Sequence, residues 1–432
     1  MKKILVTIPL ALAGISGAWA QQIPDTQAKD AYIYAYSMDE AYKFFYNTAI
    51  KTSTPLNRFQ NIRHIADDTY TDHVTINNDT LHLMGWLDVG AEPVIVSVPD
   101  MDKGRYWILH TMDMGHYTNG MIGSRTRGTK GGVFMFASSS WKGEVPASVN
   151  EVIRVESDIV KMMGRIMAVD KADEKIALGY MDKWNLRTLS QYLGVSGPKP
   201  KVRTYPDPSK TNWLQRVNFV LCEGTMGEAD KKWLNQYTAI GLAPCKQNFT
   251  PAQLEAVARG EKLGMQHLKE LAPKMANAGK LLGTRKELGN GTRDLFAEGT
   301  YLGQWGLPAD ETVYLKAEVG SDGMHLNGSN GKKYRLQFKA PEVSQFWSFT
   351  VYASDNRLMA HNMINRHSRG DRTLTPSKDG LYIIELAAQG NANNPNYLPI
   401  PEKDAYIILR MYGPSKSVQN GDYKFPILEV VK

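Results

Sequence analysis

The stretch from Gln345 to Tyr352 constrains the fold of this chain more than any other, because it predicts a strand that is apolar on both faces. Successive side chains of a strand point to opposite faces. One face carries Phe346, Ser348, Thr350 and Tyr352, and the other carries Trp347, Phe349 and Val351. Since both faces are largely apolar or aromatic, we expect both to be covered, as at the centre of a β-sandwich.

The rest of the C-terminal part has the pattern of an all-β domain. Short runs rich in β-branched and aromatic residues are separated by Gly, Asn and Pro turns; besides 346–352 they cover residues 313–319, 334–338, 381–386 and 405–412. Several short strands at such spacing are typical of a β-sandwich or a jelly roll. We therefore predict a jelly-roll-like β-sandwich at the C-terminus.

The N-terminal part mixes helical and strand patterns. Apolar and aromatic residues recur at helical spacing from residue 25 to about residue 49. Buried strands are predicted at 94–98, 105–112 and 133–137, and a second helical region at about 170–192. The fold class is therefore α+β, and we expect a mixed or antiparallel sheet in the N-terminal domain.

Four prolines between residues 196 and 212 predict a linker, because they exclude a helix or a central strand there. A helix begins beyond it at Thr250-Pro-Ala-Gln253, where Thr250 caps the helix, Pro251 takes its first position and Gln253 its third. It should run to about Leu271, because Pro273 follows. This segment predicts a helical connector between two domains.

The first 20 residues have the pattern of a secretory signal peptide. Met1-Lys-Lys3 is basic, residues 4–15 form a short apolar run, and Ala18-Trp-Ala20 has the form of a cleavage site. The apolar run is too short for a membrane span, and no later stretch approaches one. We therefore expect an exported chain, periplasmic or secreted, with no membrane span.

About 410 residues remain after the signal peptide, which is too many for one hydrophobic core. We predict a signal peptide at residues 1–20, an N-terminal α+β domain at 21–196, a proline-rich linker and helical connector at 197–300, and a C-terminal β-sandwich at 301–432.

Cys222 and Cys245 are the two cysteines of the chain. An even pair in an oxidising compartment predicts a disulfide, and two buried free thiols are the alternative.

The basic and acidic residues are scattered along the chain. Lys and Arg total 51 against 44 Asp and Glu, a formal net charge of +7. Nucleic-acid binding needs basic residues clustered on one face with aromatic residues between them, and the sequence has no such cluster. We expect no nucleic-acid partner, and the sequence leaves a homo-oligomer open.

Several motifs occur in combination: Asn78-Asp-Thr-Leu81, Trp86-Leu-Asp88, Gly104-Arg-Tyr106 and Trp141-Lys-Gly143, then Phe346-Trp-Ser348, Asn365-Arg366 and Leu409-Arg-Met-Tyr-Gly-Pro414. With them the chain resembles a bacterial exported family that pairs two domains of unknown function, numbered twelve fifty-four and twelve fourteen. The resemblance covers nearly all of the mature chain. It implies an α+β domain joined to a jelly-roll-like domain, and it implies no reaction. His82, Tyr397 and Ile400 replace the family's Tyr, Trp and Ala, which could change what the site accepts.

Both groups of motifs mix charged residues with aromatic ones, as ligand pockets do. We expect a cleft between the domains that binds a small polar molecule or a saccharide. Trp347 would stack on the ligand, Arg125 and Arg366 would clamp it, and Asp79 would accept hydrogen bonds or protons. The predicted lining residues are Asn78, Asp79, Arg105, Arg125, Trp347, Asn365 and Arg366. A capping role for Asp79 is equally open. For Arg366, hydrogen bonds to carbonyls or to a carboxylate at the edge of the sheet are favoured over ligand binding.

The sequence does not decide whether the protein is an enzyme. One alternative is a hydrolase with Asp79 as general base, assisted by an arginine or a metal; another is an envelope scaffold without a small ligand. No nucleophile elbow, phosphate loop, dinucleotide motif or zinc-protease motif is present. His110, Asp113 and His116 lie close in sequence, but ordinary polar contacts are favoured there over a metal. We predict no cofactor, and a divalent metal stays open.

Overall fold

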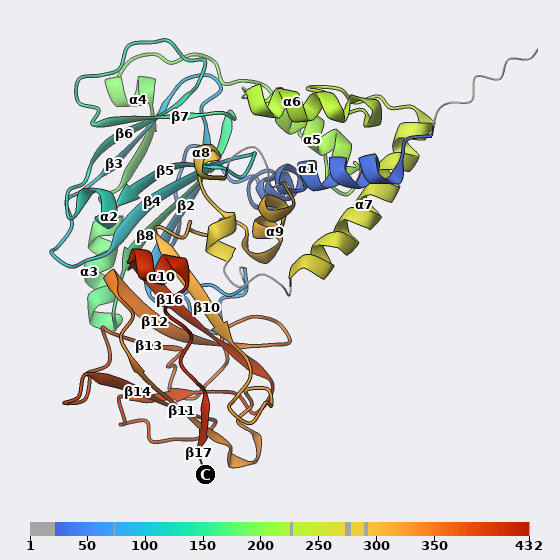
Figure 1. Cartoon of the computed structure of the whole chain (residues 1–432). Coiled ribbons are helices and arrows are strands. Elements are labelled where there is room, and N and C mark those ends of the chain that lie inside the picture. Colours follow the sequence, from blue (N-terminus) through green and yellow to red (C-terminus); the bar gives the residue numbers. More distant parts are fainter. Residues whose placement is uncertain (1–21, 73, 225–227, 273–277, 289–292, 432) are drawn as a thin grey trace, which may run out of the picture.

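The structure is a computed structural model that describes residues 22–72, 74–224, 228–272, 278–288 and 293–431. The predicted signal peptide lies outside the described residues. Two β-sandwiches and a layer of helices make up the described chain (Figure 1). This arrangement confirms the α+β class and the β-rich C-terminal domain.

The N-terminal half contains two facing sheets. Within the described residues the first has the strand order β1-β2-β8-β4-β5 and is antiparallel, and the second has the order β7-β6-β3-β9, with β6 and β7 parallel. An apolar cluster that includes Leu83, Trp107 and Phe134 belongs to both sheets and fills the space between them. The strands are β1 Gln60–Ile62, β2 Thr80–Asp88, β3 Val94–Val98, β4 Trp107–Asp113, β5 Thr118–Gly123, β6 Gly132–Ser138, β7 Glu151–Val155, β8 Ile159–Met167 and β9 Asn185–Thr188.

Short helices flank these sheets: α2 Ser124–Arg127, α3 Lys171–Met181 and α4 Leu189–Leu193. The predicted helical region at 170–192 is therefore interrupted. After α3 the chain forms β9, which pairs with β3, and Thr188 then caps α4. Pairing with the edge of β3 overrides the helical pattern at these four residues.

Strand β8 lies in the middle of the five-stranded sheet, and all nine of its residues are buried. Met162 and Ile166 point into the core between the two sheets. Because side chains alternate, Lys161, Met163 and Arg165 point to the opposite face. That outer face is covered by the helices and by the C-terminal domain, so these three side chains lie where the parts of the molecule meet.

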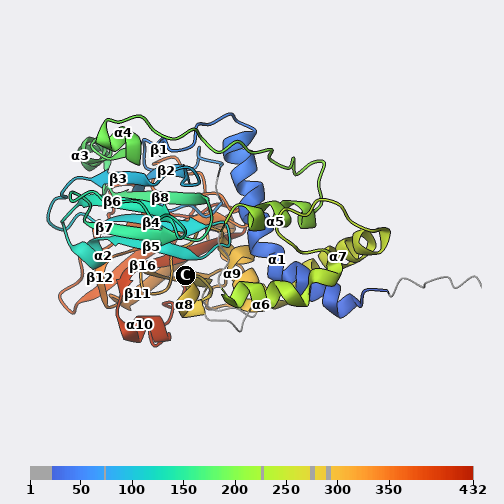
Figure 2. The ribbon, with the colours of Figure 1, turned by 90° about the horizontal axis from the view of Figure 1, so that it is seen from above.

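The helical layer is built around α1 Asp25–Phe45, which a π-helical turn extends to Ile50. It packs on α7 and α9 (Figure 2). Glycines allow the close approach of α7, since a Cβ at Gly260 would lie 2.4 Å from the carbonyl oxygen of Ala28. The capping box of Thr250 and Gln253 begins α7 as predicted. The other helices are α5 Trp213–Cys222, α6 Glu228–Gln236, η2 Thr238–Ile240, α7 Pro251–Leu271, η4 Ala278–Leu281, α8 Arg285–Leu288 and α9 Arg293–Gly303.

The C-terminal domain is a sandwich of two four-stranded sheets, with the orders β10-β16-β12-β13 and β15-β14-β11-β17 among the described residues. In β12, Trp347 and Phe349 point into the sandwich core, whereas Phe346 and Tyr352 pack against the N-terminal domain. This confirms that the strand is covered on both faces. The elements are β10 Thr312–Ala317, η5 Ser329–Gly331, β11 Lys333–Lys339, β12 Val343–Ala353, β13 Ser368–Gly370, β14 Leu381–Ala387, β15 Tyr397–Pro399, β16 Ala405–Pro414, α10 Lys416–Asn420 and β17 Glu429–Val431.

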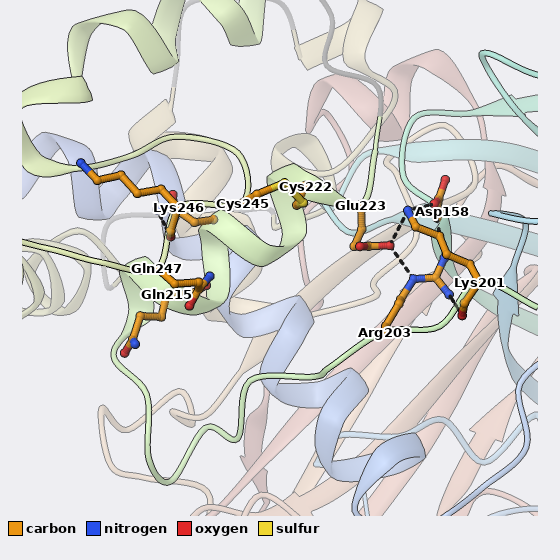
Figure 3. Close-up of a disulfide and its surroundings, with 10 residues drawn as sticks. Asp158, Lys201, Arg203, Gln215, Cys222, Glu223, Cys245, Lys246 and Gln247 are labelled. Atoms are coloured by element: carbon orange, nitrogen blue, oxygen red, sulfur yellow. Dashed lines mark hydrogen bonds and ion pairs between the residues drawn. A yellow bond between two sulfur atoms is a disulfide. The ribbon is translucent and has the colours of Figure 1, made fainter.

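Cys222 and Cys245 form the predicted disulfide, which closes a loop across a sequence separation of 23 (Figure 3). Cys222 is the last residue of α5. The bond therefore ties the end of this helix to the segment that leads to α7.

The proline-rich segment is attached to the N-terminal sheets by an ion cluster beside the disulfide (Figure 3). The side chain of Arg203 is 1% exposed, and its guanidinium contacts Asp88, Asp158 and Glu223. Lys201 contacts Asp158 and Glu223 as well. Although residues 201–206 form no regular element, their path is fixed by these contacts.

Candidate functional site

A cavity of about 920 Å³ lies between the N-terminal five-stranded sheet, the segment after α9 and the outer face of the C-terminal sheet. Each part contributes side chains. Strands β2 and β8 contribute His82, Met84, Met163 and Arg165; the segment after α9 contributes Gln304 and Trp305; β16 contributes Tyr406, Ile408, Arg410 and Tyr412. The cavity is therefore assembled from residues that are far apart in the sequence.

Arg165 is the most informative side chain of this cavity. It is 7% exposed, and its Nε and Nη1 have no hydrogen-bond partner among the described residues. It also forms no ion pair with a described carboxylate. A guanidinium has five N–H donors, and burying it without partners is costly. A buried, unpaired arginine in the wall of a cavity indicates a site for a negatively charged group.

Two further donors in the wall also lack protein partners. The side-chain Nε2 of Gln304 and Nε1 of Trp305 are buried without a hydrogen bond to the described residues. The backbone at Trp305 has φ of 60°, which is uncommon for a residue other than glycine. Its backbone N–H donates to Nε2 of His116 at 3.2 Å, which helps to hold this conformation. Neighbouring unsatisfied donors favour a ligand with acceptor atoms.

Arg410 is a second buried cation in the same wall, with 3% of its surface exposed. It donates to the backbone oxygen of Thr75 at 2.6 Å and to the hydroxyl of Thr350 at 3.2 Å. Burial lowers the pKa of Arg410, but Tyr352, Tyr412 and Asp79 raise it, and the net shift is upward. The guanidinium therefore stays protonated and adds positive charge to the cavity.

Lys316 and Glu318 also line the cavity, but they neutralise each other across 2.5 Å and are about half exposed. Phe44, Tyr301, Trp305, Tyr314, Tyr406 and Tyr412 supply aromatic surface. Asp72 and Arg357 are exposed residues of opposite charge that also line the cavity. Among the described residues, the unpaired charge of the buried wall is thus positive and lies among aromatic rings. Such a wall suits a molecule with an anionic group and an apolar or ring-shaped body.

Three of the residues predicted from the sequence, Asn78, Asp79 and Trp347, meet at a separate pocket of about 30 Å³. This volume is close to that of one water molecule. Ser348 donates to Asp79 at 2.7 Å. Burial raises the pKa of Asp79, and Arg410 and Ser348 lower it, with a net upward shift. The amide of Asn78 bonds to the backbone oxygen of Ala66.

The ring of Trp347 packs inside the C-terminal sandwich. It lies edge-on to Phe338 and Tyr382, with ring centroids 5.3 and 4.9 Å apart. This packing does not favour the predicted stacking on a ligand. The role stays a prediction, and the aromatic surface of the large cavity comes from other residues.

The remaining predicted residues hold the fold together at separate places. Arg105 bonds to Asp173 and to the backbone oxygen of Met167. Arg125 pairs with Asp310 and Glu311, and Asn365 bonds to His367. Arg366 donates to the backbone oxygens of Ala392, Asn394 and Tyr397, as the favoured alternative predicted. These four side chains have partners within the protein, and none of them lines either pocket.

His110, Asp113 and His116 make ordinary polar contacts within the protein. His110 bonds to Thr118, and Asp113 accepts from Asn119. Burial lowers the pKa of His116 to about 3. Throughout the part of the chain that the structure describes, there is no group of three or more His, Cys, Asp or Glu side chains placed to hold a metal ion.

Arg165, Gln304 and Trp305 were not predicted from the sequence. One signal was present: Lys161 and Arg165 are basic residues four positions apart within an otherwise apolar run. In a strand this spacing puts both on the same face. A second signal was His82, which departs from the family pattern and lines the cavity.

The fold and its inter-domain cavity define a two-domain α+β protein, and both halves match family models. Residues 56–187 match "Protein of unknown function (DUF1254)" and residues 311–416 match "Protein of unknown function (DUF1214)". The chain belongs to the family that pairs these two domains. Among the described residues no helix has the length and apolar character that a membrane span requires.

Among solved structures, the chain is similar to the VPA0106 protein from Vibrio parahaemolyticus, with 62% identity, a TM-score of 0.86, and coverage of 94% of this chain and 100% of that one. A putative uncharacterized protein from Burkholderia cenocepacia has 12% identity and a TM-score of 0.46, over 93% and 88% of the two chains. Comparison with curated proteins gave no match.

Proposed function

We propose that this is an exported protein that binds a small polar molecule with an anionic group in the cavity between its domains. The observation that carries the proposal is the buried guanidinium of Arg165, which lines the cavity without an acidic partner among the described residues. Arg410 adds a second buried positive charge. The volume of about 920 Å³ is within the range of small-molecule sites.

The side chains of the wall determine which kind of non-ionic group the ligand carries beside its anionic group. Aromatic side chains from α1, the segment after α9, β10 and β16 surround the cations. A ring, whether aromatic or the ring of an acidic saccharide, can stack on such side chains. A neutral saccharide can stack on the aromatic side chains, but it provides no negative charge to pair with Arg165.

The cavity favours a binding protein over the two alternatives from the sequence. A hydrolase that uses Asp79 as general base needs that carboxylate in the substrate site, and Asp79 lies instead in the 30 Å³ pocket. A scaffold without a ligand gives no reason for an unpaired arginine in a large cavity. Export is supported by the leader-like first 20 residues and by the disulfide.

A thermal-shift panel tests the proposal. The mature protein from Gln21 is melted with and without EDTA, and with phosphate, benzoate, galacturonate and neutral galactose. We expect the organic anions to raise the midpoint by a few degrees, because a ligand at 100 times its Kd adds about 2.7 kcal/mol. Galactose and EDTA should change little. Equal shifts of the melting midpoint with galactose and with galacturonate would show that the negative charge of the ligand does not contribute to binding.

The variant Arg165→Met tests the residue itself. It should weaken the binding of the best organic anion by about 10–100-fold, which corresponds to the loss of a charged hydrogen bond. It should also raise the melting midpoint of the ligand-free protein, because an uncompensated buried charge is removed. Isothermal titration calorimetry measures the affinity, and calorimetric melting measures the midpoint.

Arg369→Met is the matched control. Arg369 is also an arginine with a buried Nε that lacks a partner among the described residues, but it does not line the cavity. The change in net charge is the same, so anion affinity should stay within about twofold of the unmodified protein. A strong loss of stability in Arg165→Met with unchanged anion affinity would show that Arg165 has only a structural role.

A further inference from the structure

Lys161 is a buried amine without an acidic partner in the part of the chain that the structure describes. It is 4% exposed, and its Nζ lies 4.9 Å from the ring centre of Trp86 and 5.4 Å from that of Phe44. No described carboxylate forms an ion pair with it. Burial alone lowers the pKa of Lys161 to about 7, which brings the uncharged amine into the neutral pH range.

The amine lies beside the cavity. Phe44, which its Nζ contacts, is part of the cavity wall, and so is Met163, the next residue on the same face of β8. Trp305, another wall residue, packs edge-on against Trp86 with ring centroids 5.5 Å apart. Arg165 follows Lys161 by four residues on this face, about 13 Å along the strand. Lys161 is not itself a wall residue, but its Nζ lies against Phe44, which is one, and Arg165 lines the cavity farther along the same face of β8.

Packing alone does not account for a lysine at this position. A desolvated contact with an aromatic face contributes about 2 kcal/mol, whereas a buried ammonium without a counter-ion costs several kcal/mol. Methionine would fill the same volume without that cost. A lysine in an apolar pocket is, however, the usual way to obtain an uncharged and nucleophilic amine at neutral pH.

We propose that Lys161 forms a Schiff base with an oxo acid, an aldehyde or ketone that also carries a carboxylate, bound in the inter-domain cavity. The lone pair of Nζ attacks the carbonyl carbon and forms the C–N bond. A first proton passes from nitrogen to oxygen and gives a carbinolamine. The second proton of the nitrogen then leaves with the hydroxyl group as water, the C–O bond breaks, and the C=N bond forms. The identity of the ligand rests on the proposed function, because Arg165 would bind the carboxylate of the oxo acid. The reactivity of Lys161 is independent of the proposed function.

Reductive trapping tests this chemistry on the whole mature protein. The protein is incubated at pH 7 with 4-carboxybenzaldehyde and sodium cyanoborohydride, which reduces an imine to a stable secondary amine. Peptide mass spectrometry then locates the adduct on each lysine. Lys316 serves as internal reference, because it lines the same cavity but is paired with Glu318. We expect labelling of Lys161 to exceed that of Lys316 at least tenfold.

Parallel arms separate the two proposals. Benzaldehyde lacks the carboxylate, so it should label Lys161 more slowly, and the variant Arg165→Met should remove the difference between the two aldehydes. Equal labelling of Lys161 by both aldehydes in the unmodified protein would support a reactive amine at Lys161. It would overturn the proposal that the ligand is an oxo acid. If benzoate shifts the melting midpoint but neither aldehyde labels Lys161 above Lys316, the Schiff base is overturned and the anion site stands.

Discussion

Lys161 and Arg165 show what single residues contribute to this fold, because both are cations that β8 buries on one face without acidic partners among the described residues. Each of these buried charges lowers the stability of the ligand-free protein. Sites that bind or react often carry such costs, and replacing the residue then stabilises the protein while removing its function. Stability and binding should therefore move in opposite directions when either residue is changed.

The titration of Lys161 gives a prediction with a definite sign. Its pKa is about 7 in the folded protein and about 10.4 in an unfolded chain. Between these values the unfolded state binds more protons, so this residue makes the free energy of unfolding rise with pH. Below pH 7 both states are protonated and the full penalty, on the order of 4 kcal/mol, is present.

Lys161→Met should therefore melt several degrees above the unmodified protein at pH 6–7, and the difference should shrink toward pH 10. Calorimetric melting of both proteins across this range measures the difference, and other titrating groups cancel in the comparison. A difference that stays constant with pH would mean that Lys161 is not held uncharged by burial.

At the scale of elements, the contact between α1 and α7 depends on glycine. A Cβ at Gly260 would lie 2.4 Å from a backbone oxygen of α1, so one of the two helices would have to move. Gly260→Ala should lower the free energy of unfolding by about 1–3 kcal/mol. Gly179→Ala in α3 is the control: its Cβ would meet nothing within 4 Å, and alanine should stabilise that helix by up to about 1 kcal/mol. Urea denaturation measures both.

The disulfide is the second prediction at this scale. It closes a loop across a separation of 23 residues, for which the chain-entropy model gives a stabilisation of about 3 kcal/mol. The double variant Cys222→Ser with Cys245→Ser should unfold at a correspondingly lower urea concentration. A thiol assay confirms that the unmodified protein has no free cysteine. An unchanged denaturation midpoint would mean that the loop is already restricted in the unfolded chain.

The sequence predicted well those elements whose pattern is local. The capping box at Thr250 begins α7, and the strands of the C-terminal sandwich lie within a few residues of their predicted positions. It did not predict β2 and β8, the two strands at the centre of the cavity wall. In β8 Lys161 and Arg165 interrupt an apolar run and Gly164 weakens it further, so neither alternation nor a helical period emerges.

The candidate site was predicted only in its location between the domains. Asn78, Asp79 and Arg125 do contact the other domain, but as partners of Ser368, Ser348 and Glu311. A charged residue in a motif looks the same in the sequence whether it binds a ligand or a neighbouring strand. What separates Arg165 from Arg125 is the absence of an acidic partner among the described residues, and only the three-dimensional structure shows that.

At the scale of the whole molecule, Glu311 joins the two domains. The carboxylate of this 2%-exposed residue accepts from the hydroxyl of Tyr106 at 2.8 Å and pairs with Arg125 at 2.7 Å. Arg125→Met leaves the buried carboxylate with the hydroxyl of Tyr106 as its remaining side-chain donor among the described residues, and should cost about 3 kcal/mol. Arg63→Met is the control, because Arg63 pairs with Asp182 on the surface and the melting midpoint should hardly change.

The cavity has a consequence for inheritance. Its wall combines residues from position 44 to position 412, and the two domain models that match the chain cover opposite sides of it. A recombination event that moved either coding segment alone would transfer a β-sandwich that carries one side of the cavity wall, without the residues that complete the cavity. The proposed binding property would therefore belong to the pair of domains, and selection for it would act on both segments as one heritable unit.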